Sequence, residues 1–387
     1  MRIILTGGGT GGHVTPLKPV IQQLKQIDPS VEIMFVGQKN DPFSQLIQPD
    51  GEVDQVELIN TGKYRRYPNE SLLQRLFDVS THGRNFIDVF KIAASTIRSI
   101  RLIRKFKPDV VFGNGGFVSV PVGWAASFAK VPLVIHESDA RPGVATRILS
   151  GRSNKVLFGV PTRTTTIKGK AVEFVGIPLR QAFTQPQKHS KEDLKLKLGF
   201  DPKLPLVTVS GGSLGAEAIN NALIASIPLI VEKAQIAHIT GDKNLERVHS
   251  QTTDYVDSEK YQAIGFTDSI DSFFAASDIV VTRASATTFS ELACLGKATI
   301  LIPAKQLSDQ IENASVLNEK GVAEVIDEHD LETDGSLLGN YIVELLGDGP
   351  RLHKLQDAIA KMAKPDAARA VAKWIYMLGG GDVTTKE

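Results

Sequence analysis

The chain has 387 residues, of which 42% are hydrophobic and 22% are charged. This composition excludes wholesale disorder, collagen-like repeats and coiled coils, and the length predicts two domains of roughly 150 to 200 residues each. The 44 Lys and Arg residues nearly balance the 43 Asp and Glu residues, so the net charge of +1 does not favour nucleic acid as a partner. The single cysteine, Cys294, excludes an internal disulfide and a cysteine-cluster metal site, and it indicates a reducing compartment.

No stretch of the sequence reaches the roughly 18 apolar residues of a membrane-spanning helix, and residues 2–5 form too short an apolar run for a signal peptide. We therefore expect neither secretion nor a membrane span. Short β-branched runs alternate with amphipathic stretches along the chain, which is typical of α/β proteins with parallel sheets and crossover helices. The expected strands form two series, at residues 2–5, 32–36, 110–112 and 133–135, and at residues 206–209, 235–239, 279–282 and 299–302.

The polar, lysine-rich stretch at residues 181–203 indicates a connector with a surface helix, so we place the domain seam near Arg180. A helical period continues over residues 352–378, with a break at Pro365, and predicts a terminal helix that crosses back onto the first domain. The expected division is a first domain at 1–178 with the helix at 366–380, a second domain at 179–365, and a flexible tail at 381–387.

Each series opens with a strand followed by a glycine-rich loop, at residues 7–12 and 210–216. Glycines let the backbone approach a ligand, and the helix that follows offers unpaired N–H groups to an anion. Gly7, Gly9 and Gly12 also satisfy the G-x-G-x-x-G pattern of dinucleotide-binding domains. That interpretation requires an acid at the end of the second strand, which here runs into Gly37-Gln38-Lys39. The alternative for one loop alone is a tight turn that holds no ligand, and two such loops in register make that alternative weaker.

The most informative segment is residues 278–296, where a buried strand delivers the chain to a helix start rich in small hydroxyl residues. Backbone donors and the positive end of the helix dipole at this helix start suit a phosphate. Glu291 follows one turn inside that helix, and its carboxylate can accept two hydrogen bonds from a ribose diol. Taken alone, Glu291 is better explained as a solvated helix charge.

With these segments in place, the sequence resembles the MurG family of peptidoglycan N-acetylglucosaminyltransferases, which have the two-domain GT-B fold. The resemblance covers nearly the whole chain in order and depends on the spacing of all its motifs together. These motifs are residues 7–13, 113–119, 136–137, 175–180, 211–216, 283–291 and 309–314.

The resemblance implies two Rossmann-like domains with a cleft between them, in which UDP-N-acetylglucosamine is held mostly by the second domain. The donor residues that it implies are Arg180 and Ser213 at the diphosphate, with Thr287 and Thr288 at the helix start, Glu291 at the ribose, Phe266 and Thr267 at the uracil, Ala286 beside the sugar, and Gln310 at the sugar hydroxyls. The acceptor and phosphate loops that it implies contain Thr10, Gly11, Gly12, Gly115, Gly116 and Asp139.

Glycosyl transfer requires a stabilised leaving diphosphate, a deprotonated acceptor hydroxyl and the exclusion of water. The glycine loops, the helix start and Arg180 supply positive potential, and no Asp-x-Asp pair occurs, so we expect no metal to be required. His13 is the candidate general base, because an imidazole has a suitable pKa. The alternative is a neutral histidine that only orients the loop. We expect His136, with Glu137, to shape the acceptor wall.

The sequence departs from the family pattern at five positions. Phe117 stands where tyrosine is usual, Ser138-Asp139 replace Gln-Asn, and Ile177 replaces asparagine. Ser285 replaces a glycine, so its side chain would either obstruct the nucleotide or force another loop path. Asp139 adds negative charge to a pocket that should receive a diphosphate lipid.

Residues 60–110 contain 11 Lys and Arg residues and 4 acids, a local charge of +7, interspersed with leucine and phenylalanine. With roughly 1 kcal/mol per basic residue near an anionic surface, such a segment predicts reversible membrane docking. The alternative is a solvated helix face over buried apolar residues. We expect a peripheral protein on the cytoplasmic side of the cell membrane. The basic residues at the start of this segment, with the apolar residues between them, are Lys63, Arg65, Arg66, Leu72, Leu73, Arg75, Leu76 and Phe77.

The resemblance implies an inverting transfer of N-acetylglucosamine to the C4 hydroxyl of undecaprenyl-diphospho-N-acetylmuramoyl-pentapeptide, which is the conversion of lipid I to lipid II. Two other hypotheses stay open from the sequence. One is a UDP-N-acetylglucosamine 2-epimerase on the same two halves, or another GT-B lipid glycosyltransferase. The other is a nucleotide-sugar binding module, in which Glu291 and Ser213 bind and His13 is dispensable.

Overall fold

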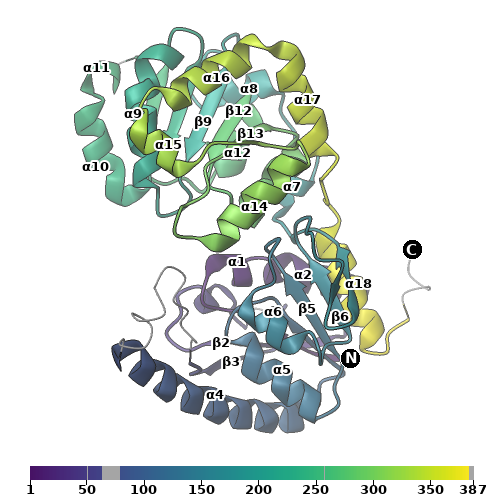
Figure 1. Cartoon of the computed structure of the whole chain (residues 1–387). Helices are drawn as coiled ribbons and strands as arrows, with labels where there is room; N and C mark the ends of the chain where they lie inside the picture. The colour runs from purple at the N-terminus through teal and green to yellow at the C-terminus, as the bar shows by residue number, and fades with distance from the viewer. Residues whose placement is uncertain (50, 63–78, 257, 383–387) are drawn as a thin grey trace. The chain divides into compact units, whose positions relative to one another are not determined.

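The computed structural model describes residues 1–49, 51–62, 79–256 and 258–382. The chain divides into two compact units, Met1–Arg180 with Asp366–Glu387, and Gln181–Pro365. We call them the N-terminal and C-terminal units, and Figure 1 shows the elements of each. The basic and apolar residues at the start of the predicted membrane-docking segment, from Lys63 to Phe77, lie outside the described residues.

The N-terminal unit is built on an eight-stranded sheet in the order β3-β2-β1-β4-β5-β6-β8-β7, parallel except for the β7–β8 pair. Its strands are β1 Arg2–Thr6, β2 Glu32–Gln38, β3 Gln55–Ile59, β4 Val110–Gly113, β5 Leu133–Glu137, β6 Lys155–Phe158, β7 Thr166–Ile167 and β8 Lys170–Phe174. Its helices are α1 Gly11–Val14, α2 Leu17–Ile27, η1 Ser44–Leu46, α4 Val79–Phe106, α5 Ser119–Phe128, α6 Val144–Leu149 and α18 Ala367–Leu378.

Alternating strand residues build two apolar layers, because successive side chains of a strand point to opposite faces. Ile3 and Leu5 of β1 pack against α1, α2 and α18, whereas Ile4 packs against α4, α5 and α6. The terminal helix α18 lies beside α2 and buries Ile375 completely, so the predicted return of the chain to the first domain is confirmed. The helical period of residues 352–378 is interrupted at residues 361–366, around the predicted break.

The C-terminal unit has a six-stranded parallel sheet in the order β11-β10-β9-β12-β13-β14. Its strands are β9 Leu206–Ser210, β10 Gln235–Ile239, β11 Tyr261–Ile264, β12 Ile279–Thr282, β13 Ala298–Leu301 and β14 Glu324–Val325. Its helices are α7 Gln181–Thr184, α8 Lys191–Lys197, α9 Glu217–Ile230, α10 Asp242–Gln251, α11 Thr253–Val256, α12 Ile270–Ala276, α13 Ala286–Leu295, α14 Ser308–Glu319, α15 Glu328–Thr333, α16 Leu337–Gly347 and α17 Gly349–Ala360.

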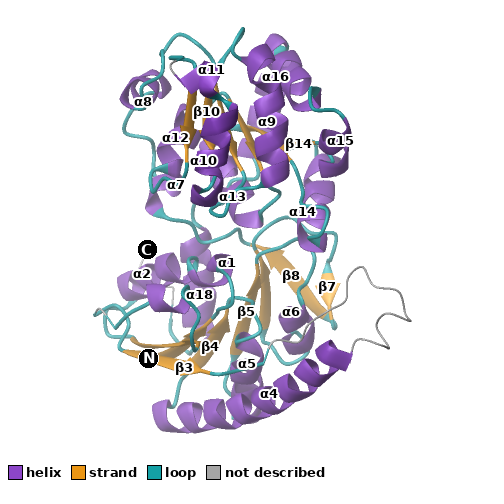
Figure 2. Ribbon diagram, turned by 90° about the vertical axis from the view of Figure 1, so that its left-hand side faces the viewer, coloured by secondary structure: helices purple, strands orange, loops and turns teal. Residues whose placement is uncertain are grey.

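Helices cover both faces of this sheet: α9, α16 and α17 pack on one face, and α8 and α12 pack on the other. Figure 2 shows α9 and α16 on the opposite side of the strands from α8 and α12. The predicted strand at residues 299–302 begins one residue after the observed one, because pairing with β12 begins at Ala298. Both sheets reverse their strand order beside the first strand, at the β1–β4 and β9–β12 pairs. In open parallel sheets, ligands bind at the carboxyl ends of the strands at such a reversal. This topology confirms the α/β class and the two Rossmann-like halves.

Candidate functional site

In the N-terminal unit, the strand reversal brings together the loops that follow β1 and β4. The ring of His13, from the first loop, lies on Gly115 and Gly116 of the second. A Cβ atom at Gly115 would be 2.8 Å from His13 Cδ2, so no larger residue fits beneath the ring. Gly116 has a φ of 73°, a conformation that side-chain-bearing residues rarely adopt. The two predicted acceptor loops therefore meet at His13.

Three polar groups hold this junction. The Nδ1 atom of His13 lies 3.0 Å from Thr10 Oγ1, and Asn114 donates through Nδ2 to the His13 carbonyl at 3.1 Å. Asn114 Oδ1 in turn lies 2.9 Å from Nδ1 of His136, whose Nε2 is 2.9 Å from the Gly176 carbonyl. Burial lowers the pKa of His136 to about 4, so its ring is uncharged at neutral pH, and its two contacts link the segments that follow β4 and β8.

The first glycine loop is also held by Asp41, which the sequence analysis did not single out. Its Oδ2 accepts hydrogen bonds from Gly9 N and Ser44 Oγ, both at 2.9 Å, and its Oδ1 accepts one from Phe43 N at 3.2 Å. Asp41 lies three residues after β2, close to where a dinucleotide-binding domain places its ribose-binding acid. Here the carboxylate is occupied by the loop itself, and the Gly9 N–H is already bonded.

Glu137 ends β5 and organises the segment that contains Asp139. Its side chain is buried and accepts hydrogen bonds from Gly143 N at 2.7 Å and from Asp139 N at 3.4 Å. Burial, with a smaller contribution from the nearby Asp139, raises the pKa of Glu137 to about 7. Asp139 is half-buried in this segment, between Glu137 and α6.

In the C-terminal unit, the reversal at the β9–β12 pair brings the loop at residues 211–216 beside the start of α13. Ser213 is exposed in this loop. The helix begins at Ala286, and the side chain of its N-cap residue Ser285 makes no capping hydrogen bond, so it does not occupy the backbone N–H groups of the first turn. Thr287 and Thr288 are half-buried in that turn, and Glu291 is half-buried one turn further along.

Ser285 is the residue immediately before α13. Its φ of −76° and ψ of 132° are ordinary extended values for a residue with a side chain. The loop therefore accommodates serine without backbone strain at this position. Its carbonyl accepts the N–H of Phe289 at 3.0 Å, as expected of an N-cap residue.

A buried ion pair fixes the loops after β12 and β13. Arg283 Nη2 lies 2.6 Å from Glu328 Oε1, and both side chains are largely buried. Arg283 Nη1 also donates to the Ile302 carbonyl at 3.2 Å, and Glu328 Oε2 accepts from Lys305 N at 2.9 Å. Glu328 was not predicted, because nothing in the local pattern links it to a residue 45 positions earlier.

The remaining predicted donor residues follow the carboxyl ends of their strands. Phe266 and Thr267 come after β11; Phe266 is 51% exposed, and Thr267 Oγ1 accepts from Ser269 N at 3.1 Å. Gln310 lies in α14 and its Oε1 accepts from Ala304 N at 3.0 Å. The same sheet edge therefore presents these residues with Ser213 and the α13 start. Arg180 is exposed and is the last residue of the N-terminal unit before the chain crosses.

Within residues 1–49, 51–62, 79–256 and 258–382, no group of three or more His, Cys, Asp or Glu side chains has a geometry that would hold a metal ion. No helix in the same ranges is long and apolar enough to cross a bilayer.

Comparison with known proteins identifies the family. Residues 3–158 match the glycosyltransferase family 28 N-terminal domain, and residues 206–371 match the glycosyltransferase family 28 C-terminal domain. A UDP-N-acetylglucosamine--N-acetylmuramyl-(pentapeptide) pyrophosphoryl-undecaprenol N-acetylglucosamine transferase of Clostridium botulinum (strain Loch Maree / Type A3) is 34% identical over 350 residues, 89% of this chain and 91% of the relative. The chain belongs to the MurG family of glycosyltransferase family 28.

Other MurG relatives and solved structures agree with this membership. The enzyme of the same name from Clostridium kluyveri is 35% identical and covers 85% of this chain and 87% of its own. The crystal structure of Acinetobacter baumannii MurG has a TM-score of 0.75 at 23% identity, covering 97% of this chain and 99% of its own. A UDP-GlcNAc 2-epimerase from Neisseria meningitidis has a TM-score of 0.64 at 13% identity, over 97% and 99% of the two chains, and shares the fold alone.

Proposed function

We propose that the chain transfers N-acetylglucosamine from UDP-N-acetylglucosamine to the C4 hydroxyl of undecaprenyl-diphospho-N-acetylmuramoyl-pentapeptide, with inversion at the anomeric carbon. The observation that carries this proposal is the 34% identity, over nine-tenths of both chains, to relatives named for this transfer. The strand reversals support it, because each brings a glycine loop to the carboxyl edge of a sheet. The glycosyltransferase class follows from the family itself.

The donor side of the proposal uses the edge of the C-terminal unit. The pyrophosphate lies against backbone N–H groups of residues 211–216 and the uncapped start of α13, and Glu291 accepts hydrogen bonds from the ribose hydroxyls. As the bond between C1 and the phosphate oxygen breaks, negative charge grows on the leaving diphosphate. Fixed amide dipoles and the helix terminus stabilise that charge without reorganising. Arg180 is the proposed cation at the diphosphate, so the proposal requires no metal.

The acceptor side uses the edge of the N-terminal unit. The C4 hydroxyl attacks C1 of the sugar and passes its proton to Nε2 of His13. In the tautomer that carries its proton on Nδ1, the Nδ1–H donates to Thr10 Oγ1 and Nε2 is the basic nitrogen. Gly115 and Gly116 leave room for the ring, and residues 10–12 with Asp139 border the acceptor.

The membrane surface is the proposed location of the lipid acceptor, and α4 supports this. Ile87, Phe90 and Ile97 follow a helical spacing and are more than half exposed. The neighbouring exposed basic residues on α4 are Lys91, Arg98, Arg101, Arg104 and Lys105. Exposed apolar side chains beside cations suit the headgroup region of an anionic leaflet. We infer peripheral binding to the cytoplasmic face of the membrane.

The test is incubation of the full chain with UDP-N-acetylglucosamine, with and without a short-chain lipid I analogue, followed by product analysis. Release of UDP and formation of the disaccharide only when the lipid is present would support the transfer. Formation of N-acetylmannosamine without the lipid would replace it with epimerisation. Binding of the donor with no product under either condition would leave only a nucleotide-sugar binding module.

A further inference from the structure

A pocket of about 350 Å³ lies in the C-terminal unit at the edge of the sheet opposite the donor-binding residues. Lys297, which lines it, directly precedes β13, so the pocket is at the amino end of that strand. Phe183, Leu295 and Pro365 give it apolar walls, and Gln185 and Cys294 add polar groups. None of these residues has a role in the proposed transfer.

Lys297 supplies a cation that is only partly satisfied. Its Nζ donates to the carbonyls of Ala275 at 2.6 Å and Ser277 at 3.0 Å. An ammonium group has three N–H bonds, and the third has no partner among the described residues. Burial lowers the pKa of Lys297 to about 8, with the neighbouring Lys191 adding to the effect, so the group is partly desolvated yet mostly charged at pH 7.

The nearby carboxylate does not neutralise this cation by direct contact. Asp278 is occupied by other donors: Lys191 Nζ at 2.7 Å, Lys195 Nζ at 3.0 Å and Leu206 N at 2.9 Å. The pocket therefore combines apolar walls with a cation that lacks a carboxylate partner within the described part of the chain. Such a combination is complementary to an anion with an apolar body.

Both chain connections between the two units contribute to the pocket. The chain enters the C-terminal unit at Gln181 and leaves it after Pro365. Phe183 and Gln185 lie within five residues of the first crossing, and Pro365 is the last residue before the second. An occupant of the pocket would therefore contact the start of one connection and the end of the other.

We propose that this pocket is a second ligand site, which binds a small organic carboxylate with an apolar body through Lys297. By contacting both connections, the bound carboxylate changes the turnover of the enzyme. This regulatory consequence rests on the proposed function, whereas the binding does not. The two are therefore measured separately.

The binding test uses phenylacetate as the probe and phenylacetamide as its neutral match. Affinity is measured by ligand-observed NMR on the full chain at pH 7. Cys294 gives an independent reading, because it is the only cysteine in the sequence and lines the pocket. Its alkylation by iodoacetamide, at the same pH, is timed with and without the probe.

The variants are Lys297→Met, which removes the cation, and Gln185→Glu, which adds a negative charge but keeps the Lys297 hydrogen bonds.

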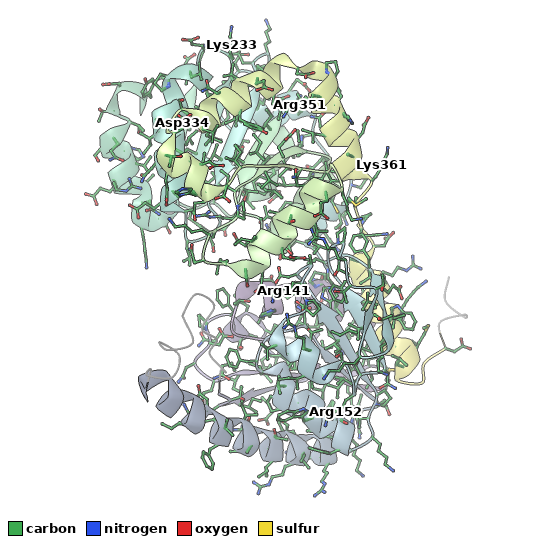
Figure 3. The ribbon with its side chains drawn as sticks, viewed as in Figure 1. Arg141, Arg152, Lys233, Asp334, Arg351 and Lys361 are labelled. Atoms are coloured by element: carbon green, nitrogen blue, oxygen red, sulfur yellow. The ribbon has the colours of Figure 1, made fainter. Side chains whose placement is uncertain are left out.

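The matched control is Lys233→Met, an exposed lysine after α9 that lies well away from Lys361 and the end of α17 (Figure 3). We expect phenylacetate to bind at millimolar concentration, to slow alkylation of Cys294, and to lose about tenfold in affinity in both variants but not in the control. Three results would overturn the site. They are equal affinities for phenylacetamide and phenylacetate, an unchanged affinity for phenylacetate in Gln185→Glu, and an alkylation rate of Cys294 that phenylacetate does not lower. Binding as expected with unchanged turnover would overturn only the regulation.

Discussion

The imidazole of His13 has its Nδ1 beside Thr10 Oγ1, and Nε2 takes the acceptor proton in the proposed reaction. We expect His13→Ala to lower kcat by about 10²- to 10⁴-fold, the usual contribution of a positioned general base. The KM for UDP-N-acetylglucosamine should change little, because the donor residues apart from Arg180 belong to the C-terminal unit. Steady-state kinetics with saturating lipid analogue measure both constants.

The control for this variant is His249→Ala, which removes an exposed histidine at the end of α10. It should retain full turnover. If His13→Ala also retained full turnover, the assignment of the base would be withdrawn. His13 would then be a residue that only orients the glycine loop.

Glu137 leads to a prediction about stability and pH. Its pKa rises from 4.5 to about 7 on folding, chiefly through burial, so the folded protein holds a proton that the unfolded chain has released. Between about pH 4.5 and 7 this group therefore makes stability fall as pH rises. Glu137→Gln removes the effect. We expect the variant to be more stable than the parent at pH 8, by up to roughly 3 kcal/mol, and to approach it at pH 5.

Urea unfolding of both proteins at pH 5 and pH 8 provides the measurement. The buried His136 is present in both, so its own pH dependence cancels in the comparison. An equal loss of stability at the two pH values would show that the hydrogen bonds to Gly143 and Asp139 outweigh the cost of burying the charge.

At the scale of single elements, α4 is the described part of the proposed membrane surface. Replacing Arg101, Arg104 and Lys105 by glutamate should weaken binding to phosphatidylglycerol vesicles by more than about a hundredfold, since each basic residue contributes on the order of 1 kcal/mol. Co-sedimentation with vesicles measures the change. Glutamate at Lys233, Lys354 and Lys361, all exposed in the C-terminal unit, is the control. Equal binding by the α4 variant and the parent would refute this surface.

The terminal helix α18 completes the core of the N-terminal unit. Ile375 is fully buried in the apolar layer shared with β1 and α2. We expect Ile375→Ala to cost about 2–5 kcal/mol in unfolding free energy, whereas Met377→Ala, at a position 43% exposed, should cost less than about 0.5 kcal/mol. Denaturant unfolding distinguishes the two. A similar small loss in both variants would mean that α18 is not part of the cooperative core.

The strands that could be predicted from the sequence are the central ones, which are buried on both faces and read as continuous apolar runs. Those that were missed are shorter or more polar, such as β3 and β11, where Gln55, Glu57 and Gln262 interrupt the pattern. Strand ends were placed too early at β1 and β9, because Thr6 and Ser210 are polar yet still pair within the sheet.

The candidate site likewise contains features that the sequence predicts and features that it does not. Glycine loops and helix starts have local signatures, and the structure places both at the carboxyl edges of the two sheets. The hydrogen bonds of Asp41 and the Arg283–Glu328 ion pair have no local sequence signature, because the partners are distant in sequence. Ser285 was expected to obstruct the nucleotide or redirect the loop, and its ordinary backbone angles show only that it is unstrained.

At the scale of the whole molecule, the two units repeat one plan. Each has a parallel sheet whose order reverses beside its first strand, and each follows that strand with a glycine loop. The loop of the N-terminal unit is bonded to Asp41, and His13 lies at its end. In the loop of the C-terminal unit, the Gly212 N–H donates to Ser210 Oγ and the Gly215 N–H donates to the Gly212 carbonyl, and Ser213 is exposed. In the proposed reaction, the same scaffold thus supplies the general base from one unit and the diphosphate-binding loop from the other.

The most direct measurement is a crystal structure of the chain soaked with UDP-N-acetylglucosamine. We predict pyrophosphate oxygens within hydrogen-bonding distance of backbone N–H groups in residues 211–216 and at the start of α13, with the ribose at Glu291. An empty C-terminal edge at saturating donor, or the side chain of Ser285 in the volume that the phosphates require, would contradict the account.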